Sequence, residues 1–125
     1  MGLFSGMMGN AADVSVEKLN EQYGQLLCNG ERIEIGFKVI RDTFIFTNKR
    51  FILIDKQGLT GKKVQFLSIP YRSISRYSIE TAGHFDLDAE FKIWIGNSIE
   101  PLKRKFNKSV NIYDVQKVLS NFVLA

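Results

Sequence analysis

Two neighbouring runs of apolar residues are the strongest feature of the pattern along the chain, and each has the length of a short strand. The runs span residues 43–47 and 50–55, and Asn48 and Lys49 lie between them. Aromatic and β-branched residues favour strands, and asparagine tolerates the positive φ that a two-residue hairpin turn requires. Both faces of this predicted hairpin are apolar, whereas a half-exposed antiparallel strand alternates apolar and polar residues. One face must therefore cover a core, and the other must be covered by another part of the chain or by a second copy.

Hydrophobic periodicity predicts a helix near each end of the chain and further strands between them. Apolar residues recur at three- and four-residue steps over 13–28, where Asp13 can cap a helix and Gly30 can follow its end. A second apolar stripe, over 111–123, begins at Asn111. Residues 1–12 carry too little pattern to place and are expected to form a flexible or loosely docked arm. Apolar runs and alternation predict the other strands at 31–38, 64–69, 74–79, 87–95 and 98–106.

This order of elements predicts a mainly β protein with an additional helix at each end. Residues 13–125 are expected to form one domain of about seven antiparallel strands. The strands, at about 31–106, would make a strongly bent sheet or a partly open barrel that the C-terminal helix closes at one end. Pro101 places the last strand at a sheet edge. The side chains predicted to fill the core are Phe37, Leu53, Phe66, Phe91, Ile93, Val115, Leu119 and Phe122.

Composition fits one globular domain in a reducing compartment. The chain has 125 residues, of which 45% are hydrophobic and 24% charged, and this balance is that of a folded protein rather than a disordered one. The net charge of +4 permits an anionic partner without requiring one. A single cysteine cannot form an internal disulfide, and no apolar run reaches the roughly 18 residues of a membrane-spanning helix. We therefore expect a cytoplasmic protein.

Four runs of sequence, at 40–50, 55–63, 68–74 and 80–88, carry a family likeness that extends over almost the whole chain. They resemble the bacterial pleckstrin-homology domain family, which was first catalogued as a domain of unknown function. The resemblance implies a barrel of two near-orthogonal sheets capped by the C-terminal helix. It also implies self-assembly into rings, with fivefold symmetry, and no known enzymatic activity.

No group of residues has the spacing of a catalytic, cofactor or metal site. The single histidine, His84, could share a metal only with Asp86 and Asp88, whereas zinc usually takes three or four ligands with cysteine or histidine prominent among them. Cys28 has no neighbouring base that would activate it. Residues 58–63 lack the spacing of a phosphate loop and join two strands rather than a strand and a helix. We predict a non-enzymatic protein without cofactor or metal.

The densest basic cluster is a candidate patch for an anionic surface, formed by Lys103, Arg104, Lys105 and Lys108. A charged edge strand that prevents aggregation explains the same residues equally well. Phosphoinositide-binding members of the wider fold gather basic residues around a long loop between the first two strands, whereas here that connection, at 39–42, is short and ends in Asp42. Nucleic acid is not expected, because aromatic residues do not alternate with the basic ones.

Two functions follow from these patterns. The first is an interaction scaffold that forms a cyclic homo-oligomer, fivefold as the resemblance implies, and that presents a surface to other proteins. Its candidate interface is one face of the apolar hairpin, namely Phe44, Phe46, Phe51 and Leu53. The alternative is a peripheral module that binds anionic membrane surfaces through its basic cluster.

Overall fold

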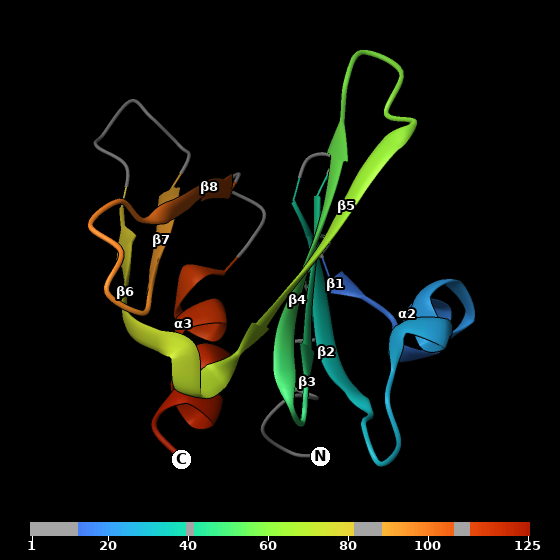
Figure 1. The fold of residues 1–125 in the computed structure, drawn as a ribbon, viewed down its shortest axis with the longest axis horizontal. Helices are drawn as coiled ribbons and strands as arrows, with labels where there is room; N and C mark the ends of the chain where they lie inside the picture. Colours follow the sequence, from blue (N-terminus) through green and yellow to red (C-terminus); the bar gives the residue numbers. More distant parts are fainter. Residues whose placement is uncertain (1–12, 40–41, 82–88, 107–110) are drawn as a thin grey trace.

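The computed structural model describes residues 13–39, 42–81, 89–106 and 111–125, which form two antiparallel sheets and two α-helices (Figure 1). The first sheet has the order β1 (Asp13–Val14), β2 (Ile33–Val39), β3 (Asp42–Thr47), β4 (Arg50–Gln57) and β5 (Lys63–Pro70). The second sheet contains β6 (Ile74–Glu80), β7 (Ala89–Ile95) and β8 (Leu102–Phe106). The helices are α2 (Val16–Tyr23), which continues into the 3-10 turn η1 (Gly24–Leu26), and α3 (Ile112–Val123); the 3-10 turn η2 (Tyr71–Ser73) joins the sheets.

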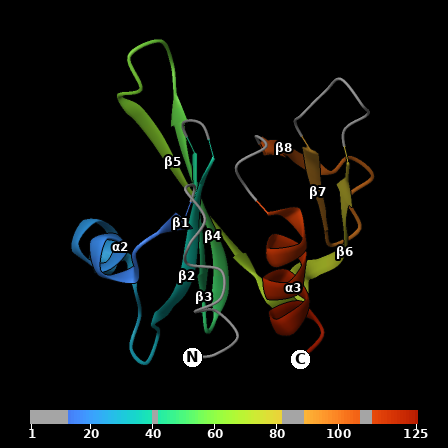
Figure 2. The same ribbon diagram turned by 180° about the vertical axis from the view of Figure 1, so that it is seen from behind.

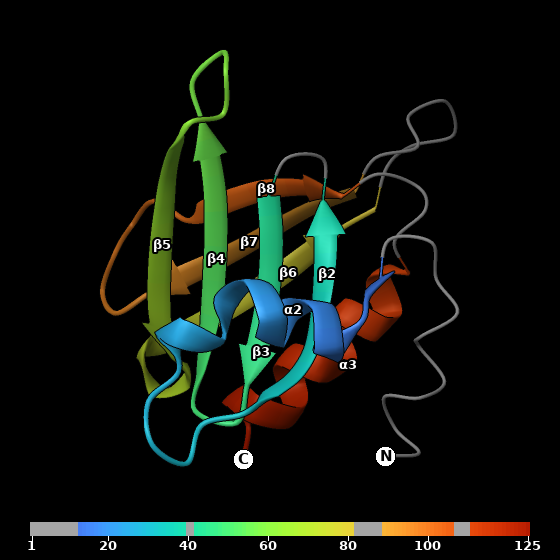
Figure 3. The same cartoon turned by 90° about the vertical axis from the view of Figure 1, so that its right-hand side faces the viewer.

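The elements lie in layers around the five-stranded sheet. The three-stranded sheet and α3 lie on one side of it, and α2 lies on the other (Figures 1 and 2). Figure 3, a view turned by 90° from that of Figure 1, shows that the strands of the two sheets cross at a steep angle. Seven of the described strands have five to eight residues each, and β1 adds a two-residue pairing. The predicted mainly β barrel with a helix near each end is therefore confirmed.

The main core fills the space between the two sheets and α3. Phenylalanine side chains dominate it: Phe44 contacts Phe51, Phe91 and Phe106, with ring centroids 5.3–5.6 Å apart. Among the predicted core residues, Phe37, Leu53, Phe91, Ile93, Val115 and Leu119 are buried, and Phe122 is partly buried. Removing these apolar side chains from water is the main favourable contribution to the stability of the domain.

Phe66 is the exception among the predicted core residues, because 49% of it is exposed. It lies on β5 opposite Ile54 of β4. Ile54 belongs to the cluster on the outer side of the five-stranded sheet, so Phe66 faces the same outer side. The prediction that Phe66 is a core residue was wrong, because the register places it away from the barrel and on an edge strand.

A second, smaller core covers the outer face of the apolar hairpin. Leu19 of α2 packs with Ile45 of β3 and with Ile52 and Ile54 of β4, and each of the four is at most 1% exposed. Gly36 of β2 permits this packing, since a Cβ atom there would overlap Cδ1 of Leu19. The second face of the hairpin is thus covered by the chain itself.

The first helix is shorter than the pattern predicts. Asp13 and Val14 pair with β2, opposite Phe37 and Gly36. The Ser15 side chain, rather than Asp13, caps the helix by accepting a hydrogen bond from the Lys18 N–H. The α-helix then ends at Tyr23, and Leu27 is already extended. Strand pairing before the helix and a 3-10 turn after it account for the difference.

Several sequence-based predictions fall outside the described residues. These are the arm at 1–12, the loop with His84, Asp86 and Asp88, and the basic residue Lys108. Within the four described ranges, no helix is long and apolar enough to span a membrane.

Candidate functional site

The predicted interface residues of the apolar hairpin lie inside the barrel. Phe44, Phe46, Phe51 and Leu53 are all 0% exposed and belong to the main core. Phe46 stacks on Phe51 at 4.8 Å between ring centroids. These side chains fill the space between the sheets and cannot contact a second copy in this fold, which corrects the predicted interface. Both faces of the hairpin are apolar, as predicted, and α2 rather than a second copy covers the outer face.

The predicted basic patch is divided between the two faces of β8. Lys103 and Lys105 are exposed, whereas Arg104 is partly buried on the other face. The Arg104 guanidinium donates to Asp42 Oδ2 at 3.0 Å and to Asp55 Oδ2 at 3.1 Å. Arg104 therefore joins the second sheet to the first and is neutralised by two carboxylates. Burial and the neighbouring Asp55 raise the pKa of Asp42, and Arg104 partly offsets this increase.

The exposed lysines of β8 share their sheet face with acidic residues. Lys105 pairs in register with Glu90 of β7, and Lys103 pairs with Lys92. Lys92 in turn lies 3.5 Å from carboxylate oxygens of both Glu80 and Glu90. The described part of the predicted patch is thus a surface of mixed charge rather than a continuous cationic field.

A buried carboxylate network, centred on Glu31, holds the loop before β2 against the hairpin. Oε2 of Glu31 accepts hydrogen bonds from Thr47 Oγ1 at 2.7 Å and from Arg50 Nε at 2.8 Å. Oε1 accepts from the Cys28 N–H and from a terminal nitrogen of Arg50, both at 3.0 Å. Burial alone would raise the pKa of Glu31, but these donors outweigh it and lower the pKa from 4.5 to about 2. Each oxygen of Glu31 accepts two hydrogen bonds from within the protein, so the network serves to hold the structure together.

The free edge of the five-stranded sheet is the first candidate interaction surface. Among the described strands, β5 pairs only with β4, and it is exposed along most of its eight residues. It presents Val64 (36% exposed) and Phe66 (49% exposed), and the Phe66 ring contacts Tyr23 of α2 edge to face at 6.4 Å. A long edge strand with exposed apolar side chains is a template for pairing with another chain.

The hairpin between β4 and β5 is the second candidate surface. It projects beyond the rest of the barrel (Figure 1). Its tip is shaped by Gly58 and Gly61, whose φ values of 79° and 69° favour glycine. Leu59 stands fully exposed between them, and exposed Lys62 and Lys63 follow. The tip thus combines an exposed apolar side chain with two adjacent lysines.

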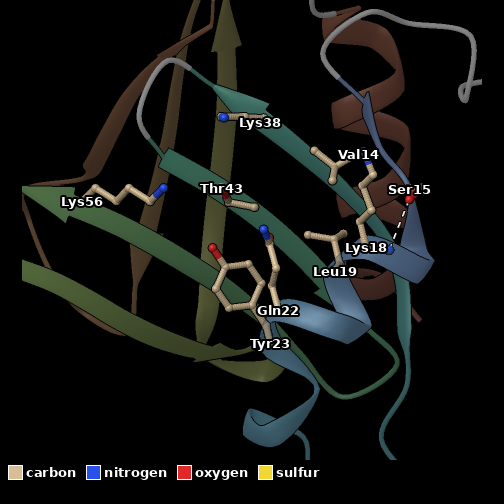
Figure 4. Close-up of a pocket in the computed structure, with 9 residues that line it drawn as sticks. All are labelled: Val14, Ser15, Lys18, Leu19, Gln22, Tyr23, Lys38, Thr43 and Lys56. Carbon is tan, nitrogen blue, oxygen red and sulfur yellow. Dashed lines mark hydrogen bonds between the residues drawn. The ribbon is translucent and has the colours of Figure 1, made fainter. Parts of the chain in front are cut away.

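The third candidate is a groove of about 410 Å³ on the outer face of the five-stranded sheet (Figure 4). It is lined by Val14, Ser15, Lys18, Leu19, Gln22, Tyr23, Lys38, Thr43 and Lys56. Three of these nine residues are lysines and none is acidic. Sequence analysis did not reveal the groove, because its lysines are 18 to 20 residues apart in the chain and come together only when α2 lies across the sheet.

The described residues offer no metal centre and no nucleophile paired with a base. No group of three or more histidine, cysteine, aspartate or glutamate side chains in these ranges could hold a metal ion. Cys28 is an exposed free thiol. The three candidate surfaces lie on the outer side of the five-stranded sheet, at its edge and at the tip of the β4–β5 hairpin.

The two crossed sheets closed by a C-terminal helix define a pleckstrin-homology-like domain. The chain belongs to the bacterial PH domain family, whose model matches residues 2–123. It is 52% identical over 121 residues to YjqA, an uncharacterized protein of Bacillus subtilis (strain 168), and the match covers 96% of this chain and 97% of YjqA.

Solved structures of related domains share the fold. A pleckstrin homology domain from Shewanella amazonensis SB2B is 43% identical and superimposes with a TM-score of 0.84, covering 99% of this chain and 100% of that one. A DUF1696 family protein with a pleckstrin-homology domain from Shewanella loihica PV-4 is 46% identical, with a TM-score of 0.80 and coverage of 91% and 97%. The predicted family and fold are thereby confirmed.

Proposed function

We propose that this protein is a non-enzymatic scaffold that assembles into a cyclic homo-oligomer and presents its remaining surface to other proteins. Fivefold symmetry is the form that the family resemblance implies. The observation that carries the proposal is the β5 edge, which pairs with no described strand other than β4 and bears the half-exposed Phe66. The proposed interface thus lies at β5 rather than on the buried hairpin residues.

The physical argument rests on what an edge strand leaves unsatisfied. The free edge of β5 presents backbone N–H and C=O groups that a neighbouring strand can pair with. Val64 and Phe66 would add apolar burial at the same contact, at roughly 25 cal/mol per Å² removed from water. The opposite end of the sheet is the two-residue β1, so the two ends of the sheet differ. A head-to-tail contact between two unlike surfaces closes into a ring when the rotation between copies permits.

Light scattering after size-exclusion chromatography tests the assembly. We expect the wild-type mass to be a multiple, about fivefold by the family resemblance, of the 14.3 kDa of one chain. Val64→Lys with Phe66→Lys should reduce the mass to that of a folded monomer, because two charges would then face the partner. Tyr113→Lys, at a 73% exposed aromatic residue of α3, is the matched control and should leave the mass unchanged. A wild-type mass of 14.3 kDa at tens of micromolar would overturn the proposal.

A second candidate function is binding to anionic membrane surfaces, which the tip of the β4–β5 hairpin favours. Among the described residues, Leu59 is the most exposed large hydrophobic residue. Inserting it would remove most of its surface from water and contribute about 1.5–3 kcal/mol, while each lysine near an anionic surface adds about 1 kcal/mol. This moves the predicted membrane contact from β8 to the hairpin.

Co-sedimentation with vesicles tests the membrane function. Vesicles of phosphatidylcholine with phosphatidylglycerol should bind the protein, and added salt should weaken the binding. Leu59→Ser should reduce binding about tenfold or more. Ile99→Ser, at an 86% exposed aliphatic residue outside the hairpin, is the control. Equal binding by wild type and Leu59→Ser would exclude the hairpin as the membrane contact.

A further inference from the structure

The outer face of the three-stranded sheet is open in the described part of the chain, where no helix or strand lies over it (Figures 1 and 2). Its inner face belongs to the main core, in which Phe91 and Ile93 of β7 are at most 1% exposed. Successive side chains of a strand point to opposite faces, so Lys92 and Trp94 of β7 lie on the outer face. Lys103 of β8 pairs with Lys92 and lies there as well. This face can therefore meet a partner without any change in the fold.

A tryptophan and an arginine lie in contact on this face. Trp94 is the single tryptophan of the chain, and it is only partly buried. Arg76 of β6 is its partner in the strand register and lies over the indole, with Cζ 4.5 Å from the ring centroid. The contact holds the guanidinium in place, while the N–H groups at its edge can still bind a carboxylate through two parallel hydrogen bonds. Tryptophan and arginine are among the residues that most often dominate the energy of protein–protein interfaces.

The charges of this face are distributed unevenly around Trp94. The carboxylates lie at the other end of the strands, where Glu80 pairs in register with Glu90, and both lie 3.5 Å from the ammonium group of Lys92. Three further cations of the face form no ion pair with a described carboxylate, namely Arg76, Lys103 and Lys105. The described strands thus place four cations and two carboxylates here, a net charge of +2, with unpaired positive charge beside the indole. An acidic partner complements this arrangement.

We propose that the outer face of β6–β8 binds an acidic segment of another protein. Arg76 binds one carboxylate, Lys103 binds a second, and Trp94 packs against an apolar side chain between them. Arg76 and Lys103 are two strands and one row apart, so standard sheet spacings place their Cα atoms about 12 Å from each other, the length of about four residues of extended chain. The proposal rests on the scaffold function, for which it names the surface and the partner, but it uses the second sheet and leaves the β5 edge free.

Titration of the full-length protein with a synthetic peptide, followed by the fluorescence of Trp94, tests the proposal. The peptide carries two glutamates four positions apart with a leucine between them, and a saturable change in fluorescence is expected. Arg76→Gln with Lys103→Gln should weaken binding about tenfold or more, because each cation makes a charge-assisted contact. The matched control, Lys62→Gln with Lys63→Gln, removes the same net charge from the β4–β5 hairpin and should retain wild-type affinity. An absence of a saturable change in the wild type, or an equal loss in the control variant, would overturn the proposal.

Two further measurements separate this face from the assembly and from another class of partner. Light scattering of the Arg76→Gln, Lys103→Gln variant should give the wild-type mass, and a lower mass would make the face a contact between copies and overturn the proposal. A wild type that binds the peptide as a 14.3 kDa monomer would overturn the assembly alone, whereas an assembled wild type that does not bind it would overturn the acidic partner alone. Oligouridylate that changes the Trp94 fluorescence at lower concentrations than the peptide would assign the face to single-stranded RNA and likewise overturn the acidic protein partner.

Discussion

Replacing Glu31 by glutamine should both destabilise the fold and remove a defined part of its response to acid. The Glu31 side chain is fully buried and accepts four hydrogen bonds, two of them from Arg50. Glutamine has nearly the same shape, but its amide nitrogen would face donors, and Arg50 would keep a charge without a counter-ion. Breaking such a buried pair costs about 3–5 kcal/mol, so the free energy of unfolding at neutral pH should fall by roughly that amount.

The pH dependence of the free energy of unfolding gives a second expected magnitude for Glu31→Gln. The pKa of Glu31 is 4.5 ordinarily and about 2 in the fold. A depressed pKa stabilises the folded state above pH 4.5, and this stabilisation is lost as the pH falls from 4.5 through 2. The shift corresponds to roughly 3 kcal/mol. The difference in stability between wild type and Glu31→Gln should therefore be largest at pH 6 and above, and should shrink by roughly 3 kcal/mol near pH 2.

Urea unfolding of both proteins, at pH values from 7 to 2, measures this difference. Other carboxylates titrate in both proteins and cancel from the comparison. Glu80→Gln is the control, because its carboxylate is 66% exposed and its pairing with Lys92 is a surface contact worth about 0–1 kcal/mol. If Glu31→Gln proves too unstable to titrate, Thr47→Val removes one donor to Glu31 and should cost about 1–2 kcal/mol. A difference between wild type and Glu31→Gln that stays constant with pH would refute the role given to this carboxylate.

Three further predictions concern packing and charge. Leu119→Ala, at a residue of α3 with 0% exposure, should cost about 2–5 kcal/mol in chemical unfolding, and a cost near zero would mean that α3 is not docked on the core. Gly36→Ala should destabilise the protein by about 1–3 kcal/mol because its Cβ overlaps Leu19, and Leu19→Ala should recover part of that loss, so that the double variant is less unstable than the sum. Arg104→Gln leaves Asp42 and Asp55 adjacent without their shared cation, so thermal unfolding should show a larger loss at pH 7 than at pH 4, where protonation relieves the repulsion; an equal loss at both pH values would contradict that account.

The sequence predicted the barrel well because each strand has a recognisable pattern of apolar residues within its own segment. The alternation at Ile33, Ile35 and Phe37, and the apolar runs on either side of Asn48, identified strands that the structure confirms. The family likeness supplied the crossing of the two sheets. The apolar stripe of the C-terminal helix, which ends at Val123, is likewise a local signal, and it identified α3 within about a residue at each end.

The binding surfaces could not be predicted in the same way, because they depend on which side each strand faces. Phe66 has the same apolar character as Phe51, and only its register with Ile54 shows that it lies outside the barrel. Arg104 sits among lysines in the sequence, yet it alone points toward Asp42 and Asp55. The predicted interface residues of the hairpin were wrong for a related reason, since nothing in the hairpin itself reveals that α2 covers its second face.

The packing of α2 on the outer face of the β3–β4 hairpin also sets an order of events during synthesis. The chain is made from its N-terminus, so α2 leaves the ribosome before the β3–β4 hairpin on which Leu19 packs. An eight-residue helix is too short to persist alone in water, and its partners Ile45 and Ile52 lie some 26 to 33 residues later in the chain. The meander from β2 to β5 has short connections and can form first, leaving its outer isoleucines open until α2 returns to them. Helix α2 is thus made before the strands that it covers but docks after they have paired, and the interval before it docks is when the nascent sheet is most exposed to unwanted association.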